Sequence, residues 1–326
     1  MPRSPDHVFI LAPLRGVTEL CFRQAFCAHM SGLDRAVAPF IATVPGDRVK
    51  PELLRGIDPE VQPAGLPLTP QVIGKDPAQL RVMLRAMKAL GYVDVDLNAG
   101  CPWPFVAKKG RGAGLLRDEY TLCAMLEAGC DELGEGHFSL KVRLGLDDAS
   151  LLPKRLPAIL QFPLRELCVH PRTARQMYTG TVDLEAFAAV AEACTLPLVY
   201  NGDLCTPADF ARLSSRFPSI HRWMIGRGVV ANPFLVESLR AQADTRDWAR
   251  FHAWHADLFA RFAAEAPGDH ALLGRLKELW AYLAPTFVNG GSLWNALKIT
   301  RTRAEFERVL ALAAPLRWSG RGETCV

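Results

Sequence analysis

Polar side chains and glycines recur in this 326-residue sequence at the points where short apolar runs end. Together they offer a thiol, an imidazole, several cations and flexible backbone, which are the groups needed to bind an anionic ligand and to transfer a proton. The positions are Pro13-Leu14-Arg15-Gly16, Gln71, Asn98-Ala99-Gly100-Cys101-Pro102, Lys141, Arg143, His170, Asn201-Gly202-Asp203 and Gly226-Arg227-Gly228.

Cys101 follows a glycine and precedes Pro102 and Pro104, so we expect a stiff loop that holds the thiol in place. A free thiol has a pKa near about 8.5 and is mostly protonated at neutral pH, so it can donate a proton. It could equally act as a nucleophile if a neighbour activates it, and a free cysteine can also be a small buried apolar residue. The spacing alone does not choose among these roles.

Lys141 lies inside an apolar run, Phe-Ser-Leu-Lys-Val-Arg. An amine that points into a protein core needs a partner, because burial of an unpaired charge is costly; the alternative is that the side chain extends outward to solvent. His170 ends the next run and is placed for ligand binding, although a lone histidine can be structural. The glycine-containing turns around Gly202 and Gly226 either bind a phosphate or are ordinary turns.

These groups must be positioned by the elements that precede them. The apolar runs predict eight strands, separated by helical stretches, and this alternation predicts a (β/α)8 TIM barrel. Reactive groups of such barrels lie at the carboxyl ends of the strands, and phosphates bind after strands seven and eight. The expected strands are Val8–Ala12, Ala36–Ile41, Thr69–Ile73, Val93–Asn98, Phe138–Arg143, Glu166–His170, Leu198–Asn201 and Trp223–Ile225.

The alternation stops near Trp248, and four helical patterns follow. We therefore expect two domains, a barrel over residues 1–245 and a small all-helical domain over residues 246–326. The segment Val44–Leu68, rich in proline and glycine, predicts a long loop with a possible hairpin. The expected helices after the barrel are Trp248–Ala266, Ala271–Leu283, Leu293–Thr300 and Ala304–Ala313.

The composition narrows the class of protein. Hydrophobic residues make up 49% and charged residues 22%, which excludes wholesale disorder. No uncharged apolar run reaches about 18 residues, and the apolar stretch near the N-terminus is too short for a signal peptide, so we expect a cytoplasmic protein without a membrane span. No CxxC pair or His/Cys cluster occurs, so we expect no metal site. The net charge of +4 is compatible with an anionic partner.

Six ordered motifs resemble the tRNA-dihydrouridine synthase family. LAPLRGVTELCFR resembles the opening APMxGVTDxxFR pattern of that family, and DLNAGCPWPFVAKKGRGAGLLRD resembles its LNxGCPxxxVxxxxxGAxLL segment. KVRLGL, VHPRTARQMYTG, NGDL and IGRGVVANP follow in the expected order. The GCPxPxV and VHxRTxxxxYxG forms, with the helical C-terminus, are most similar to the subfamily that modifies uridine 16 of the D-loop.

The resemblance implies an FMN cofactor and a tRNA substrate. Cys101 would be the general acid, and Asn98 and Tyr178 would contact the uridine or the RNA. The family often has Met and Glu where this chain has Leu14 and Arg15, and Glu where it has Asp203. The residues implied in FMN binding are Pro13, Leu14, Arg15, Gln71, Lys141, His170, Asn201, Gly202, Asp203, Gly226 and Arg227.

The implied reaction is reduction of uridine to 5,6-dihydrouridine with NADPH, or with NADH. Hydride would pass from N5 of reduced FMN to C6 of the uracil, and Cys101 would protonate C5. The uracil would be turned out of the RNA stack to reach the flavin. No GxGxxG motif follows a strand, so we expect no dedicated nicotinamide domain. We expect a monomer.

Basic residues gather in the helical C-terminal part, with a net charge of about +4 between His270 and Arg303 by direct count. A second basic run, Lys108 to Arg117, follows Cys101. Both could bind tRNA phosphates, or both could be solvated surface. Two alternative functions are an FMN barrel that reduces a free pyrimidine, as dihydroorotate dehydrogenases do, and a non-catalytic RNA-binding barrel. The residues expected to contact tRNA from the helical part are Arg275, Lys277, Tyr282, Lys298 and Arg301.

Overall fold

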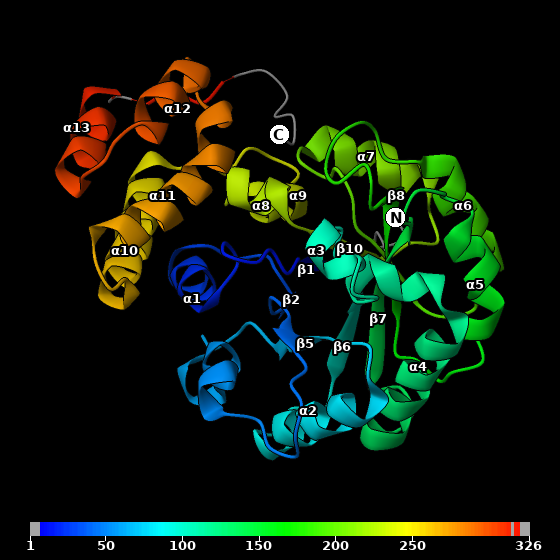
Figure 1. Cartoon of the computed structure of the whole chain (residues 1–326). Helices are drawn as coiled ribbons and strands as arrows, with labels where there is room; N and C mark the ends of the chain where they lie inside the picture. The colour runs from blue at the N-terminus through cyan, green and yellow to red at the C-terminus, as the bar shows by residue number, and fades with distance from the viewer. Residues whose placement is uncertain (1–6, 314–315, 320–326) are drawn as a thin grey trace.

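Parallel strands form the centre of the computed structural model, which describes residues 7–313 and 316–319 (Figure 1). Most are short, apolar and buried, as expected for strands that helices cover on the outside. The strands are β1 (Val8–Leu11), β2 (Arg35–Val37), β3 (Ile41–Ala42), β4 (Leu68–Thr69), β5 (Gln71–Ile73), β6 (Val95–Ala99), β7 (Phe138–Gly145), β8 (Leu167–Thr173), β9 (Leu198–Tyr200) and β10 (Arg222–Ile225).

The ten strands occupy eight positions of a closed barrel. Strand β2 pairs with β4 and β3 pairs with β5, and only Pro70 separates β4 from β5. Proline has no N–H to donate, which interrupts the ladder at this point, but its carbonyl still accepts the Asp96 N–H at 2.9 Å. Since β1 pairs with both β10 and β2, the sheet closes on itself. The predicted TIM barrel is confirmed.

Helices follow most strands and cover the barrel. Side-chain oxygens cap several of their first turns: Asp76, Asp118 and Asp183 accept backbone N–H groups, and Thr206 forms a capping box with Asp209. The helices are α1 (Leu20–His29), α2 (Pro77–Ala89), α3 (Pro104–Ala107), α4 (Glu119–Leu133), α5 (Leu151–Ile159), α6 (Leu184–Ala193), α7 (Pro207–Arg216), α8 (Arg227–Ala231) and α9 (Leu235–Ala241).

The connection between β3 and β4 differs from the sequence prediction in one respect. It contains two 3₁₀ helices, Pro51–Ile57 and Pro59–Val61, and no hairpin. Prolines at the start of both helices explain the difference, because proline fixes the backbone for a helical first turn and cannot donate to a strand ladder.

Four helices follow the barrel, beside α1 and α8 (Figure 1). Helix α10 packs against α1 through Trp254, whose ring meets Phe22 edge-on at 6.1 Å, so one apolar core runs through both parts of the chain. Among the helices that the structure describes, none combines the length and apolar composition needed to cross a bilayer. The four are α10 (Trp248–Glu265), α11 (Asp269–Leu283), α12 (Gly290–Lys298) and α13 (Arg303–Ala313).

The barrel interior changes character along its axis. A small apolar cluster fills the middle, made by Ile10, Val37, Cys168, Val199 and Met224 from five strands. Toward the carboxyl ends of the strands, charged and polar side chains such as Lys141, Arg143 and His170 join apolar ones in the lining of a cavity. The apolar cluster therefore forms a packed floor beneath an open upper half that also contains charged side chains.

Candidate active site

A cavity of about 600 Å³ opens at the carboxyl ends of the strands. This volume lies in the usual range of small-molecule and cofactor sites. Most residues that the sequence predicted to bind a cofactor or substrate line the cavity: Pro13, Leu14, Arg15, Asn98, Cys101, Lys141, His170, Tyr178, Asn201, Gly202, Asp203, Gly226, Arg227 and Tyr282.

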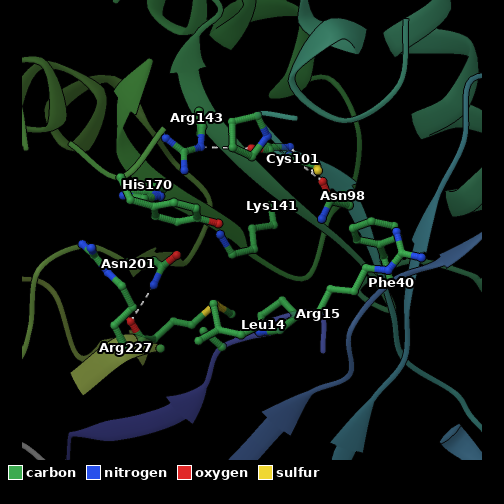
Figure 2. A pocket seen from close by; sticks show the side chains of 18 of the residues that line it. Leu14, Arg15, Phe40, Asn98, Cys101, Lys141, Arg143, His170, Asn201 and Arg227 are labelled. Atoms are coloured by element: carbon green, nitrogen blue, oxygen red, sulfur yellow. Dashed lines mark hydrogen bonds between the residues drawn. The ribbon is translucent and has the colours of Figure 1, made fainter. Parts of the chain in front are cut away.

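The lining residues divide the cavity into two sides. Figure 2 shows Asn201 and Arg227 on one side, Asn98 and Cys101 on the other, and Lys141 between them. They come from four strands or the segments that follow them: Asn98 and Cys101 from β6 and its loop, Lys141 from β7, Asn201 from the loop after β9, and Arg227 from the start of α8, after β10. The barrel topology thus places residues that are more than 100 positions apart in the sequence around one space.

The side with Asn201 and Arg227 has close backbone packing. The Asn201 side-chain N–H donates to the Met224 carbonyl at 2.8 Å and ties the end of β9 to β10. A Cβ added to Gly228 would lie 2.2 Å from the Leu204 carbonyl oxygen, so only glycine fits where these two loops meet. Glycines here leave backbone N–H groups accessible to an anion.

Asp203 neutralises part of the positive charge in this corner. Its carboxylate accepts from Arg172 Nη1 at 2.8 Å and Nη2 at 2.5 Å, and from Arg227 Nη2 at 2.8 Å. Two guanidinium groups on one carboxylate leave one net positive charge, which suits a bound phosphate. Sequence reasoning assigned Asp203 to the phosphate itself; the structure places its carboxylate on the two arginines.

Lys141 and His170 line the middle of the cavity and differ in charge: Lys141 contributes an ammonium group, and His170 is neutral. Lys141 makes no hydrogen bond or salt bridge with any residue that the structure describes. Burial lowers its pKa, because the ammonium group loses hydration and has no partner to replace it. Burial, together with the charges of Arg143 and Lys141, lowers the pKa of His170 well below its usual value, so the imidazole is neutral. The ammonium group therefore lacks an acceptor that a bound ligand could supply.

Cys101 is 8% exposed and lines the cavity. Burial raises its pKa, against the opposing effects of a backbone hydrogen bond from Trp103 and the Arg143 charge. The thiol is therefore protonated at neutral pH, which suits a proton donor better than a nucleophile. Gly112 holds the loop from behind: its φ is +56°, and an added Cβ would lie 2.8 Å from that of Cys101.

A chain of hydrogen bonds positions the Cys101 loop. Asn98 Oδ1 accepts the Cys101 N–H at 2.8 Å, and Asn98 Nδ2 donates to Gln71 Oε1 at 2.8 Å. Gln71 Nε2 in turn donates to the buried carboxylate of Asp96 at 2.7 Å. Backbone N–H groups only donate, so the Cys101 N–H fixes the orientation of the Asn98 amide, and Asn98 Nδ2 in turn fixes that of Gln71. Burial raises the pKa of Asp96 to about 7.

Gln71 does not line the cavity in which a cofactor would bind. It is fully buried beneath the cavity and is absent from its lining. Its amide oxygen and one N–H are already used by Asn98 and Asp96. The structure therefore gives Gln71 a supporting position, and a direct contact with a cofactor stays a prediction.

Arg143 joins the Cys101 loop to the loop after β8. Its Nε donates to the Gly100 carbonyl at 3.0 Å, and Nη1 donates to the carbonyls of Thr173 and Met177 at 3.0 and 2.6 Å. The Tyr178 ring lies between two guanidinium groups, 5.2 Å from that of Arg143 and 5.3 Å from that of Arg227. Tyr178 is thereby fixed at the cavity mouth, with 41% of its surface exposed.

Helix α11 contributes the rim on the far side. Glu278 and Tyr282, one helical turn apart, both line the cavity. The backbone of Gly16 lies against Glu278, since an added Cβ would be 2.6 Å from its carboxylate. Burial raises the pKa of Glu278. The helical region is thus part of the cavity wall.

The basic residues predicted to bind tRNA fall into two groups. Arg275 donates to Glu265 at 2.7 Å and covers the Phe262 ring, and Lys277 donates to the Thr300 carbonyl at 2.6 Å. Lys298 and Arg301 are exposed. The first two side chains are engaged inside the helical region, while the second two face solvent.

Sequence reasoning missed several residues of the site. Arg143 was placed at a strand end without a role, although it shares the inward face of β7 with Lys141 two positions earlier. Phe40, Glu278 and the Asp96 carboxylate carry no motif of their own, and only tertiary packing brings them to the cavity or beneath it. Among the residues that the structure describes, no group of three His, Cys, Asp or Glu side chains could hold a metal ion.

The family model described as "Dihydrouridine synthase (Dus)" matches residues 10–266. A tRNA-dihydrouridine(16) synthase from Cupriavidus necator is 29% identical, over 92% of this chain and 95% of its own length. One from Shewanella oneidensis is 28% identical, over 93% and 97%. A protein from Rhodobacter capsulatus, named as a probable tRNA-dihydrouridine synthase, is 31% identical over 72% of both chains.

Solved structures show the same fold at low sequence identity. Morphinone reductase in complex with tetrahydroNAD superposes with a TM-score of 0.53 at 12% identity, over 76% of this chain and 90% of its own. The old yellow enzyme from Trypanosoma cruzi gives 0.52 at 14% identity, over 76% and 92%. At this identity the likeness extends to the barrel architecture alone.

Proposed function

This chain belongs to the dihydrouridine synthase family, and we propose from that membership that it reduces a uridine of tRNA to 5,6-dihydrouridine with FMN as cofactor. The observation that carries the proposal is the protonated Cys101 thiol, which faces a cavity that also contains an unpartnered ammonium group and a positively charged, glycine-rich corner. NADPH is the proposed electron donor, with NADH as the alternative.

The residues present fit FMN. Its phosphate would lie in the corner of Gly202, Gly226 and Arg227, where backbone N–H groups and one net positive charge are available. Its ring would lie between Lys141 and the first loop, Pro13 to Arg15. Lys141 would supply a cation to the polar edge of the ring, and the ring would supply the acceptor that the ammonium group otherwise lacks.

Reduced FMN, when bound, supplies the hydride that the uracil takes up at C6. Cys101 Sγ delivers the proton to C5, which completes the addition of two hydrogens across the C5–C6 double bond. Asn98 and Arg143 hold the loop that carries Cys101, so that the thiol keeps one position. Neutral His170 adds no further positive charge beside Lys141.

The uridine must leave the RNA stack to enter this cavity, because the cavity lies within the barrel mouth. Asn98 and Tyr178 would contact the uridine or its neighbours. The names of the relatives that align over more than nine-tenths of the chain support position 16 of the D-loop as the target. We assign residues 246–326 to tRNA binding and residues 1–245 to catalysis.

Mapping of dihydrouridine in tRNA tests this function. A strain without the gene should lose dihydrouridine at position 16 and keep it elsewhere, and a plasmid copy should restore it. A plasmid copy with Cys101→Ala should not. Unchanged dihydrouridine at every position in the deletion strain would contradict the proposal.

A further inference from the structure

Two aromatic side chains at the cavity mouth have no role in the chemistry described above. Trp103 and Phe105 line the cavity, yet 61% and 72% of their surfaces are exposed. Three other tryptophans, Trp223, Trp254 and Trp280, are buried to 1% exposure or less. Tryptophan is normally well buried, so an exposed ring at the entrance to a cavity indicates a surface that a partner covers.

The backbone presents Trp103 in a fixed position. Pro102 and Pro104 flank it, and its ψ of 124° lies in the range that the following proline favours. Its carbonyl accepts the N–H groups of Val106 and Ala107, both at 2.9 Å, and so starts helix α3. An anchored aromatic ring loses little conformational entropy when a partner covers it.

The charge beside this pair identifies the chemistry of the partner. Lys109 Nζ lies 3.9 Å from the centre of the Phe105 ring. The segment from Cys101 to Arg117 contains Lys108, Lys109, Arg111 and Arg117 and no acidic residue. None of these four forms a salt bridge with a carboxylate among the residues that the structure describes. Aromatic faces interleaved with cations are typical of surfaces that bind single-stranded nucleic acid.

We propose that Trp103, supported by Phe105, is a stacking platform for a nucleobase next to the uridine that enters the cavity, with Lys108 and Lys109 on the adjoining phosphates. The inference rests on the proposed function and deepens it. Extrusion of the uridine leaves its neighbours without a stacking partner, at a cost of unstacking that an aromatic ring at the mouth offsets.

Binding of an unmodified tRNA transcript to the FMN-loaded protein, measured at several salt concentrations, tests the platform. Trp103→Ala should weaken binding about 5- to 100-fold at every salt concentration, because a base–aromatic stack is lost. The slope of log affinity against log salt should stay that of the wild type, since no phosphate contact is removed. Trp103→Phe should restore most of the affinity.

Two matched variants complete the test. Tyr120, 84% exposed and absent from the cavity lining, is the control aromatic residue, and Tyr120→Ala should leave affinity and slope unchanged. Lys108→Ala together with Lys109→Ala should instead reduce the slope by about 2. Thermal unfolding of each variant checks that the fold is kept.

The outcomes separate this inference from the function on which it rests. Wild-type affinity for Trp103→Ala, in a protein that forms dihydrouridine, would overturn the platform alone. A reduced salt slope for Trp103→Ala would also overturn it, because the residue would then act through charge. A wild-type protein that neither binds tRNA nor forms dihydrouridine would overturn both, and a protein partner at this surface would take the place of RNA.

Discussion

The barrel mouth and the helical region both contain positively charged side chains, but only at the barrel mouth do hydrogen bonds fix several of them around one cavity. At the mouth, Arg143, Arg172 and Arg227 are fixed by backbone carbonyls or by Asp203. In the helical region, Arg275 is engaged with Glu265, whereas Lys298 is exposed. The convergence of the strand ends therefore determines the chemistry of the barrel mouth. In the helical region, the packing of each basic side chain determines whether it is free to bind RNA.

The largest effect is expected at the barrel mouth. Cys101→Ala should slow dihydrouridine formation about 10²–10⁴-fold, because a general acid is removed. Flavin content and the rate at which NADPH reduces the flavin should stay unchanged, since neither needs this proton. Cys123, on α4 and outside the cavity, is the matched control, and Cys123→Ala should keep full activity. Loss of flavin from the Cys101 variant would instead indicate a structural cysteine.

Asp96 gives the barrel interior a dependence of stability on pH. Burial raises its folded pKa from 3.8 to about 7, so between about pH 4 and 7 the folded state binds a proton that the unfolded state has lost. Folding stability should therefore fall as pH rises through this window, by up to about 4 kcal/mol for three pKa units. Asp96→Asn should lack this fall. Denaturant unfolding of both proteins at pH 5 and pH 8 measures it, and parallel pH curves would contradict it.

A substitution of Gln71 can show whether this residue supports the Cys101 loop or contacts the cofactor. Gln71→Leu leaves Asn98 Nδ2 without its acceptor and loosens the Cys101 loop, so uridine reduction should slow about 10- to 100-fold. Flavin affinity should be unchanged if the residue acts through Asn98. Single-turnover rates and flavin titration give the two values. A loss of flavin affinity equal to the loss of rate would move Gln71 into the cofactor site.

The smallest effects should separate the two kinds of cation in the helical region. Arg275→Ala removes the partner of Glu265 and should lower the unfolding free energy by about 1 kcal/mol with little change in the salt slope of tRNA binding. Lys298→Ala with Arg301→Ala should reduce that slope by about 2 and leave stability unchanged. If the salt slope of tRNA binding is the same for the Lys298/Arg301 double variant as for the wild type, the RNA does not contact these two residues.

The barrel and most of the residues that line its cavity could be predicted from the sequence for one physical reason. Apolar runs followed by polar or glycine residues mark the carboxyl ends of parallel strands, and these ends converge in any such barrel. Lys141, His170 and Cys101 could therefore be assigned to one cavity from their places at the strand ends. The split of two barrel positions into β2/β3 and β4/β5 was not predictable, because it depends on pairing across the sheet.

Contacts between side chains that are distant in the sequence could not be predicted from it either. The orientation of Gln71 is set by Asp96 on the neighbouring strand, and no local pattern reports it. Likewise, a count of charges in the helical region does not show that Arg275 meets Glu265 from the preceding helix. Exposed cations are equivalent in a sequence until packing selects which of them remain on the surface.

The proposed reaction can be reconstituted from purified FMN-loaded protein, NADPH and an unmodified tRNA transcript, with dihydrouridine located by mass spectrometry. We expect one dihydrouridine per transcript, at position 16, with the wild-type protein, and about 10²–10⁴-fold slower formation with Cys101→Ala. No dihydrouridine from the wild-type protein, or equal rates from both proteins, would contradict it.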